Sequence, residues 1–245
     1  MGINLFPDKK ACPFDCPYCE VFPFAANATF SLSQMEEELR SAIIAAQRQN
    51  VPVKDICFSG NGEPSLSPAF EQALKIASKI RKEMAASAKL VLITNGAGLL
   101  HKQIFSLLRL SAAGNGSPAL DIWLKLDAGT QIWYQKMNRP SIPFETIIAK
   151  IKEFASCAPV TIQSMLCAID GKSPPLEEEQ EWLQLVLELA KPGNIRKVQL
   201  YGKARSAPED PKASSLPPEY LEQRAASLRT VFSKNGITAP VEVYP

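Results

Sequence analysis

Three cysteines that fall within eight residues are the part of this sequence best suited to chemistry. Cys12, Cys16 and Cys19 lie in a stretch of about 26 residues, between Phe6 and Ser33, for which we expect no regular secondary structure. Thiolates are soft ligands that suit zinc or an iron-sulfur cluster. Because only three are offered here, a four-iron cluster bound by them would keep one iron open to another ligand.

Two other roles for this triplet stay open. A zinc site with three cysteines would need a remote fourth ligand, and the sequence has one histidine, His101, which we expect to be exposed or capping. A redox dithiol would need a Cys-x-x-Cys pair that opens a helix, and only Cys16 and Cys19 have that spacing. The remaining cysteines are scattered, and we expect structural roles for Cys57, Cys157 and Cys167.

The elements that must position these residues follow an alternating pattern, in which apolar β-branched runs are separated by longer segments of helical periodicity. We expect strands at Ile3–Phe6, Asp55–Ser59, Lys89–Thr94, Asp121–Leu126, Val160–Leu166 and Lys197–Tyr201. We expect helices at Ser33–Gln49, Pro68–Ala86, Leu99–Leu110, Pro143–Ala155, Glu177–Ala190 and Pro218–Asn235, with Ser33 and Ser67 as N-caps. Such βα units form an open doubly wound sheet or a complete or partial barrel, and in both the functional loops follow the carboxyl ends of the strands.

Composition and length restrict the class of protein that this sequence can encode. The chain has 245 residues, of which 46% are hydrophobic and 21% charged, which excludes a disordered or collagen-like protein. The net charge of +2 is too small to indicate a nucleic-acid or membrane partner by itself. No apolar run approaches a membrane span and the N-terminus does not resemble a secretory signal, so we expect a cytoplasmic protein with no membrane partner.

The chain is expected to form one domain over residues 1–245. The Pro-containing stretch Ser206 to Pro218 lies late in the sequence and does not separate two halves. A helix and a short strand, Pro240 to Tyr244, follow it. We expect this C-terminal segment, about residues 217–245, to pack on the rest of the domain.

The cysteine motif resembles a known signature. The spacing Cys-x3-Cys-x2-Cys in the loop after a first strand, with Tyr18 directly before the third cysteine, resembles that of the radical S-adenosylmethionine (radical SAM) enzymes. The wider string from Gly2 to Glu20 is similar to the subgroup related to tRNA wyosine-base synthases. The resemblance implies that a 4Fe-4S cluster is bound by Cys12, Cys16 and Cys19.

The same resemblance implies an activity and a fold. The open iron of the cluster would take the amino and carboxylate groups of S-adenosylmethionine, whose reductive cleavage yields a 5′-deoxyadenosyl radical that abstracts hydrogen from a substrate. The implied fold is a parallel (β/α)6 partial TIM-type barrel, within the α/β class that the periodicity indicates. The implied partner is a reducing electron donor of the flavodoxin or ferredoxin type.

The end of the second strand carries a further candidate site, Gly60-Asn61-Gly62-Glu63-Pro64. Glycines allow a backbone to approach a ligand closely, and Glu63 offers a carboxylate to an ammonium group. The alternative is an ordinary glycine-rich turn with a solvated Glu63. By resemblance this loop holds the methionine amino group of S-adenosylmethionine, with Asn61 where a glycine is commoner.

Polar residues at three further strands complete the candidate site. Thr94 and Asn95 end the third strand, where they bind the ligand or only form a turn. Lys125 and Asp127 share one face of the fourth strand, and they either pair with strand neighbours or, by resemblance, serve the carboxylate and ribose of S-adenosylmethionine. Gln163 in the fifth strand is either a buried amide or, by resemblance, a ribose or adenine contact, and Tyr18 is assigned to the cofactor by the same resemblance.

The substrate is indicated only weakly. The region around the sixth strand is locally basic, and its basic residues are Lys191, Arg196, Lys197, Lys203 and Arg205. Such residues suit an RNA base substrate, or they form a solvated basic loop. The alternatives to RNA modification are a radical enzyme that modifies or activates a protein or peptide, and a non-catalytic zinc-binding adaptor.

Overall fold

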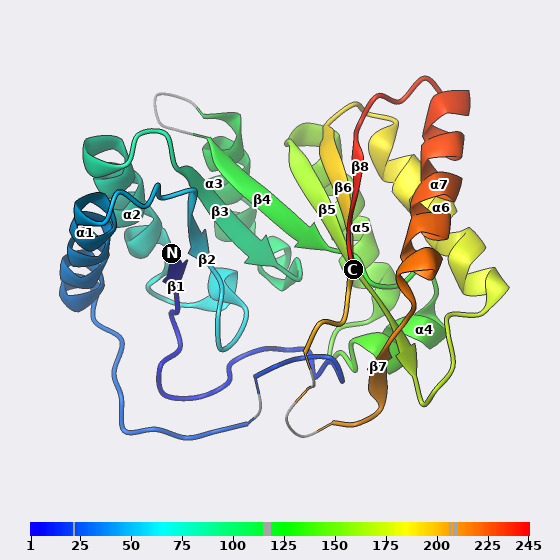
Figure 1. Cartoon of the computed structure of the whole chain (residues 1–245), viewed down its shortest axis with the longest axis horizontal. Coiled ribbons are helices and arrows are strands. Elements are labelled where there is room, and N and C mark those ends of the chain that lie inside the picture. The colour runs from blue at the N-terminus through cyan, green and yellow to red at the C-terminus, as the bar shows by residue number, and fades with distance from the viewer. Residues whose placement is uncertain (22, 115–118, 206, 208–209) are drawn as a thin grey trace. The chain divides into compact units, whose positions relative to one another are not determined.

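The computed structural model describes residues 1–21, 23–114, 119–205, 207 and 210–245, and within these the chain forms two compact units (Figure 1). The first unit comprises Met1–Cys12 and Pro23–Ile122, and the second comprises Pro13–Phe22 and Trp123–Pro245. The single domain over residues 1–245 stays a prediction.

The first unit is a parallel α/β structure. Its elements are β1 (Gly2–Ile3), α1 (Leu32–Arg48), β2 (Asp55–Phe58), the short 3-10 helix η1 (Pro64–Leu66), α2 (Phe70–Met84), β3 (Lys89–Thr94), the 3-10 helix η2 (Ala97–Leu100), α3 (Lys102–Ala113) and the start of β4 (Leu120–Lys125). Strands β1, β2 and β3 are neighbours in that order, with Ile3 opposite Phe58 and Phe58 opposite Leu92. Ile3, Phe58 and Leu92 are all buried and form the centre of its core.

The second unit continues the same pattern. Its elements after β4 are α4 (Gln131–Met137), α5 (Phe144–Cys157), β5 (Val160–Ile169), α6 (Leu176–Ala190), β6 (Ile195–Gly202), β7 (Ala213–Ser215), α7 (Pro218–Lys234) and β8 (Val241–Tyr244). Strands β4, β5, β6 and β8 are parallel neighbours in that order, and β7 pairs antiparallel with the end of β5. None of the helices in the described part of the chain is long and apolar enough to span a membrane.

The two faces of the sheet in the second unit differ in chemistry. One face is apolar and buried, as at Leu124, Ile162 and Val198, and Trp182 of α6 covers it by donating to the Leu126 carbonyl at 3.1 Å. On the other face a polar row runs through four strands in register, and its members are Lys125, Gln163, Gln199 and Glu242. Successive side chains of a strand point to opposite faces of the sheet. The apolar face is therefore the one that the helices cover, and the polar row lies on the opposite face.

Most predicted elements are confirmed, and the exceptions have local causes. Strand β3 has the predicted bounds, but β1 is Gly2–Ile3 and does not reach Phe6. Asn4 Oδ1 accepts a hydrogen bond from the Phe6 amide at 3.2 Å, which turns the chain out of the strand. Strand β5 is longer than predicted because its last residues, Cys167 to Ile169, pair with β7, an element that the periodicity did not indicate.

The predicted helix starts need three corrections. Ser31, not Ser33, is the N-cap of α1, because its Oγ accepts from the Gln34 amide at 3.3 Å. Ser67 precedes α2 without capping it, since α2 begins at Phe70. The predicted helix at Leu99–Leu110 is divided at His101, which has extended backbone angles and is exposed, so α3 begins at Lys102.

Candidate functional site

The segment before Cys12 is fixed against the loop that follows β2, within the first unit. The Ala11 amide donates to the Asn61 carbonyl at 2.9 Å, and the Glu63 amide donates to the Ala11 carbonyl at 2.9 Å. A Cβ atom at Gly62 would lie 2.1 Å from the Ala11 carbonyl oxygen, so only glycine permits this approach. The glycine-rich loop therefore sets the position of the backbone that carries Cys12.

The other side of this loop is held by the N-terminal segment. The Asn61 amide donates to Asn4 Oδ1 at 3.1 Å, and Asn61 Nδ2 donates to the Phe6 carbonyl at 3.1 Å. Gly60 has φ of 134°, which L side chains rarely adopt, and a Cβ atom there would lie 2.7 Å from Asn4 Oδ1. Asn61 thus fixes the glycine-rich loop to the N-terminal segment through these two hydrogen bonds.

Glu63 is buried and holds the ends of two neighbouring strands together. Its Oε1 accepts from the Thr94 hydroxyl at 2.7 Å and from the Ser65 hydroxyl at 2.5 Å, and its Oε2 accepts from the Asn95 amide at 2.7 Å. Burial raises the pKa of Glu63, and these hydrogen bonds oppose the rise. Glu63, Thr94 and Asn95, all predicted as site residues, are thus in direct contact, and among the described residues Oε2 accepts from one donor, the Asn95 amide.

Asn95 connects this carboxylate to the first cysteine. Its Nδ2 lies 3.3 Å from Cys12 Sγ, and its Oδ1 accepts from the Ala97 amide at 2.9 Å. Asn95 therefore forms a turn and also presents its side-chain amide to Cys12, while its contact with a ligand stays a prediction.

In the second unit, the other two cysteines form a turn around Tyr18. The Cys19 amide donates to the Cys16 carbonyl at 2.9 Å, and the Asp15 amide donates to the Asn138 carbonyl at 2.9 Å. Both cysteines are half-buried, whereas Tyr18 is buried. Asn138, the C-cap of α4, therefore fixes the start of this turn.

A polar network surrounds Asp127 beneath the turn. Asp127 Oδ2 accepts from the Tyr18 hydroxyl and, at 3.1 Å, from Asn138 Nδ2, and its Oδ1 accepts from the Met165 amide at 2.8 Å. Lys125 Nζ lies 3.6 Å from Asp127 Oδ2. The carboxylate is almost fully buried, so these donors compensate for its lost hydration.

Lys125 is enclosed by aromatic rings as well. Its Nζ lies 4.8 Å from the Tyr18 ring centre and 4.9 Å from that of Tyr201, and it is hydrogen-bonded to the Tyr201 hydroxyl. Burial acts to lower the pKa of Lys125, but the charge of Asp127 and the contact with Tyr201 outweigh it and raise that pKa. Burial raises the pKa of Tyr201 to about 12. Lys125 is therefore paired with the Asp127 carboxylate, and its role toward a ligand stays a prediction.

Gln163 lies between Lys125 and Gln199 in the polar row of the sheet. It is half-buried in β5, opposite Lys125 on one side and Gln199 on the other. In the same row, Gln199 is 4% exposed and its Oε1 has no hydrogen-bond partner among the described residues. Buried acceptors such as Gln199 Oε1 are normally hydrogen-bonded, and a ligand on this face would donate the missing hydrogen bond.

Asn138 is a residue of the site that was not found from the sequence. Asn138 contacts Cys16, Tyr18 and Asp127, but it follows α4, a short helix that the periodicity did not indicate. The N-cap of α4 was a usable signal, because Thr130 Oγ1 accepts from the Trp133 amide at 3.2 Å.

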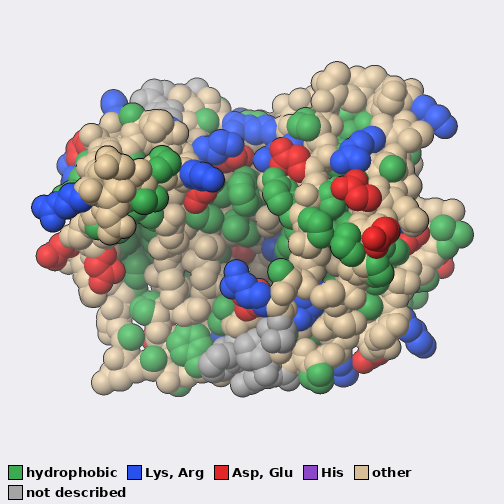
Figure 2. Space-filling model, viewed as in Figure 1, with side chains coloured by type: hydrophobic (Ala, Val, Ile, Leu, Met, Phe, Trp, Pro, Cys, Tyr) green, Lys and Arg blue, Asp and Glu red, His purple; other side chains and the backbone are tan. Residues whose placement is uncertain are grey.

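The basic residues near β6 are engaged within the second unit. Lys203 is buried and donates to the Arg205 carbonyl, Arg205 pairs with Glu20 at 2.9 Å, and Lys197 pairs with Glu242 at 2.7 Å. Acidic and basic side chains are interspersed over the face shown in Figure 2. These pairs weaken the argument for a phosphate-binding surface.

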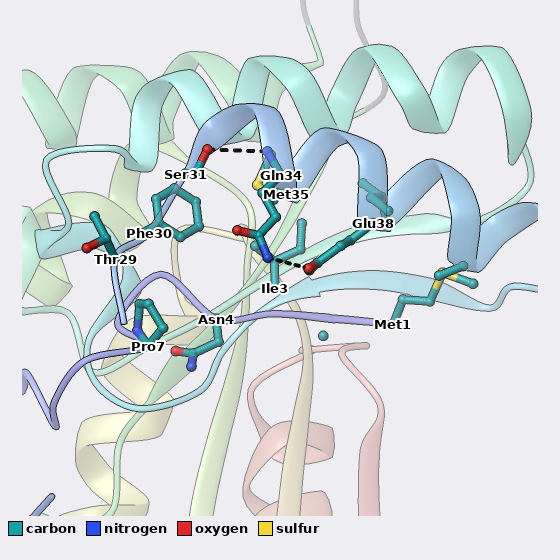
Figure 3. A pocket seen from close by; sticks show the side chains of 13 residues that line it. Met1, Ile3, Asn4, Pro7, Thr29, Phe30, Ser31, Gln34, Met35 and Glu38 are labelled. Atoms are coloured by element: carbon teal, nitrogen blue, oxygen red, sulfur yellow. Dashed lines mark hydrogen bonds between the residues drawn. The ribbon is translucent and has the colours of Figure 1, made fainter. Parts of the chain in front are cut away.

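The remaining cysteines and a pocket of the first unit lie outside this arrangement. Cys167 is fully buried beside Met137, and burial raises its pKa to about 12, as expected of a structural thiol, whereas Cys157 is exposed. A pocket of about 430 Å³ in the first unit lies between the N-terminal segment and α1 (Figure 3). Asn4, Gln34 and Glu38 line it, and none of the predicted site residues does.

The donor set of the three cysteines fits an iron-sulfur cluster. All six cysteines are among the described residues, and none of them is in a disulfide. No group of three His, Cys, Asp or Glu side chains in the described part of the chain already has the arrangement of a metal site. Cys12 and Cys16 each have an amide N–H directed at the sulfur, and such donors suit the sulfur ligands of a cluster.

Comparison with known proteins gives a short sequence match and a fold. No family model matches the chain. It is 28% identical over 102 residues to a UPF0026 protein of Helicobacter pylori strain J99 / ATCC 700824, a match that covers 39% of this chain and 30% of the relative. The same figures hold for the UPF0026 protein of strain ATCC 700392 / 26695.

Solved structures match over nearly the whole chain. SuiB of Streptococcus suis bound to precursor peptide SuiA has a TM-score of 0.72 at 14% identity, covering 100% of this chain and 48% of SuiB. A radical SAM methyltransferase from Sphaerobacter thermophilus has a TM-score of 0.67 at 15% identity, with 96% and 64% covered. anSMEcpe with bound AdoMet and a peptide has a TM-score of 0.60 at 15% identity, with 98% and 62% covered.

These likenesses confirm the predicted fold class, the parallel α/β fold of the partial TIM-type barrel. The chain spans about half the length of SuiB, 48%. The assignment to a subgroup related to wyosine-base synthases stays a prediction.

Proposed function

We propose that this protein is a radical SAM enzyme that binds a 4Fe-4S cluster through Cys12, Cys16 and Cys19. When bound, this cluster supplies the electron for reductive cleavage of S-adenosylmethionine, and the resulting 5′-deoxyadenosyl radical abstracts hydrogen from a substrate. The observation that carries the proposal is the contact chain Cys12–Asn95–Glu63, which joins the cysteine loop to the glycine-rich loop. A zinc adaptor has no need for a buried carboxylate tied to a cysteine in this way.

The chain's own residues have defined tasks in this proposal. Glu63 holds Thr94 and Asn95 and keeps Oε2 available to one further donor, such as the ammonium of S-adenosylmethionine. Lys125 and Asp127 present a fixed ion pair at the end of β4, to serve the carboxylate and ribose. Gln163 and Gln199 offer amide groups to a polar ligand on the face opposite Leu124, Ile162 and Val198.

We propose a polypeptide substrate in preference to an RNA base. Lys197 and Arg205 are each paired with a carboxylate, which reduces the positive charge near β6 that a phosphate backbone could use. Of the proteins that share the fold, SuiB is seen bound to precursor peptide SuiA and anSMEcpe with a peptide. An external reductant of the flavodoxin or ferredoxin type would provide the electron.

The test is the product of S-adenosylmethionine cleavage. Anaerobically reconstituted protein is reduced with dithionite, and 5′-deoxyadenosine is measured by mass spectrometry. We expect product from the wild type and from Cys157→Ala, which removes an exposed cysteine outside the triplet, but none from Cys16→Ala. Zinc in place of iron in the purified protein would instead favour the adaptor.

The substrate is tested in the same assay. A peptide fraction and a tRNA fraction from one cell extract are added separately to the reconstituted enzyme. We expect the peptide fraction to speed 5′-deoxyadenosine formation at least several-fold. If only the tRNA fraction accelerates 5′-deoxyadenosine formation, the polypeptide proposal is wrong and an RNA base is the favoured substrate.

A further inference from the structure

Each unit contains an asparagine whose side-chain amide donates to a cysteine sulfur. In the first unit, Asn95 Nδ2 lies 3.3 Å from Cys12 Sγ. In the second unit, Asn138 Nδ2 lies 3.4 Å from Cys16 Sγ. Both asparagines are buried, with 8% and 3% exposed, so their side chains are not free to leave these contacts for water.

The orientation of the Asn95 amide is determined by its other partner. Its Oδ1 accepts from the Ala97 backbone amide at 2.9 Å, and a backbone N–H can only donate. The nitrogen must therefore be the atom that faces Cys12. The backbone of Asn95 is fixed as well, because its amide donates to Glu63 Oε2 at 2.7 Å.

The same reasoning applies to Asn138. Its Nδ2 lies 3.1 Å from Asp127 Oδ2, and an ionised carboxylate only accepts hydrogen bonds. Rotating the amide by half a turn would bring two oxygens together. The NH2 group is thus held beside Cys16, and the Asp15 amide, which donates to the Asn138 carbonyl at 2.9 Å, ties the backbone to the cysteine turn.

The third cysteine differs from the other two. Among the hydrogen bonds of the described residues, Cys19 Sγ is placed only against the Val21 carbonyl, at 3.5 Å, and that oxygen is an acceptor. The amide donors are therefore specific to Cys12 and Cys16 and are not a general property of the loop.

We propose that Asn95 and Asn138 are positioning residues that donate to the ligand sulfurs of the cluster and raise its reduction potential. This inference rests on the proposed function. One-electron reduction by an external donor adds negative charge to the cluster and its sulfurs, and an N–H donor stabilises the more negative state. Removing either donor makes reduction harder.

The test is a redox titration of the reconstituted protein without S-adenosylmethionine, followed by electron paramagnetic resonance of the reduced cluster. Asn95→Ser keeps an oxygen that can accept from Ala97 but is too short to reach Cys12, and Asn138→Ala removes the second donor. Asn194→Ser is the matched control, because Asn194 Nδ2 donates to the Ala155 carbonyl at 3.0 Å and not to sulfur. Only the cluster-loaded fraction of each protein is titrated.

At the wild-type midpoint, we expect the ratio of reduced to oxidised cluster to fall roughly three- to tenfold for each donor removed, the equivalent of one ordinary hydrogen bond. The double variant should show about the product of the two effects, and the control none. Unchanged midpoints in cluster-loaded variants would overturn the inference while leaving the proposed function intact. A wild type that takes up no cluster would overturn both, and if Asn138→Ala does not fold, Asn95→Ser decides alone.

Discussion

At the scale of single residues, Glu63 joins the ends of two neighbouring strands. It is 2% exposed and accepts from Ser65, Thr94 and Asn95, so it determines how the ends of β2 and β3 meet. Its position could be predicted, because the carboxyl ends of adjacent parallel strands lie at one edge of a sheet. That Ser65, Thr94 and Asn95 would already donate to its carboxylate could not be predicted, since these contacts depend on side-chain packing.

Replacing Glu63 by glutamine tests this role. Glu63→Gln presents an NH2 group to donors that need an acceptor, so we expect the free energy of unfolding to fall by about 1–3 kcal/mol in urea titrations. We also expect S-adenosylmethionine binding, measured by calorimetry on the reconstituted protein, to weaken at least tenfold. The matched control is Glu71→Gln, at an exposed residue that pairs with Lys75, which should change stability by less than about 0.5 kcal/mol. Equal effects of the two changes would contradict the role of Glu63.

Lys125 and Asp127 show what spacing alone can reveal. Alternate residues of a strand share a face, so two charges there require a partner or a ligand, and the ion pair confirms one of these alternatives. Asn138 could not be found in this way. It reaches Cys16 from 122 positions further along the chain, a contact that no local pattern encodes.

At the scale of elements, most of the candidate site residues lie in the loops that follow the strands, whereas the sequence predicts the strands better than these loops. The bounds of β3 were predicted correctly and those of β4 to within one residue, because apolar runs of this length are strong signals. Strand β1 and the short elements α4 and β7 were missed or misplaced, because turns such as that of Asn4 and contacts such as that between β5 and β7 determine them. Strand β1 precedes the cysteine loop, Asn138 at the end of α4 contacts Cys16, and β7 pairs with the end of β5.

The approach of Ala11 to the loop after β2 gives an element-scale prediction. Gly62→Ala would place a Cβ atom 2.1 Å from the Ala11 carbonyl oxygen and separate the two segments. We expect a loss of about 1–3 kcal/mol in the free energy of unfolding and a loss of most iron uptake. Gly2→Ala is the control, since nothing lies within 4 Å of a Cβ there. Full iron uptake by Gly62→Ala would show that this contact is dispensable.

Helix α6 holds the loop after β4 through Glu178. This carboxylate accepts from the Gly129 amide at 2.6 Å and from the Thr130 amide at 2.9 Å, yet burial outweighs these bonds and raises its pKa to about 7. A carboxyl whose pKa is raised by folding contributes stability that is complete below its unfolded pKa, near 4.5, and is lost as the pH rises through 7. The loss amounts to at most about 3 kcal/mol.

Thermal unfolding at two pH values checks this. The melting temperature of the wild type should fall between pH 5 and pH 7.5 by several degrees more than that of Glu178→Gln, which has no proton to lose. Other acids titrate alike in both proteins, so only the difference between them is informative. Parallel pH profiles would mean that Glu178 is ionised throughout.

At the scale of the whole molecule, the fold class and the chemistry were predictable from different parts of the sequence. The spacing of apolar runs indicated repeated βα units, and the match to solved structures over 100% of the chain confirms that class. Charge and composition, by contrast, say little about the substrate. Of the basic residues near β6 that suggested RNA, Lys197 and Arg205 pair with carboxylates and Lys203 donates to a carbonyl, contacts that only the folded chain shows.

Cluster binding should also be visible in the stability of the whole chain. A ligand that binds only the folded state stabilises it by mass action. We expect the anaerobic melting temperature to rise by several degrees on reconstitution with iron and sulfide, and to return to the starting value after removal of iron with a chelator. Cys16→Ala should show no such rise, whereas Cys157→Ala should behave like the wild type. An equal rise in both variants would place the bound iron elsewhere.

The most direct test of the central claim is the electron paramagnetic resonance spectrum of the reduced protein before and after addition of S-adenosylmethionine. A cluster with three cysteine ligands has one iron open, so we predict about four irons per chain and a spectrum that changes when S-adenosylmethionine is added. The change should be absent in Cys16→Ala and reduced in Glu63→Gln. One zinc per chain and no iron signal, or a cluster spectrum indifferent to S-adenosylmethionine, would contradict the account.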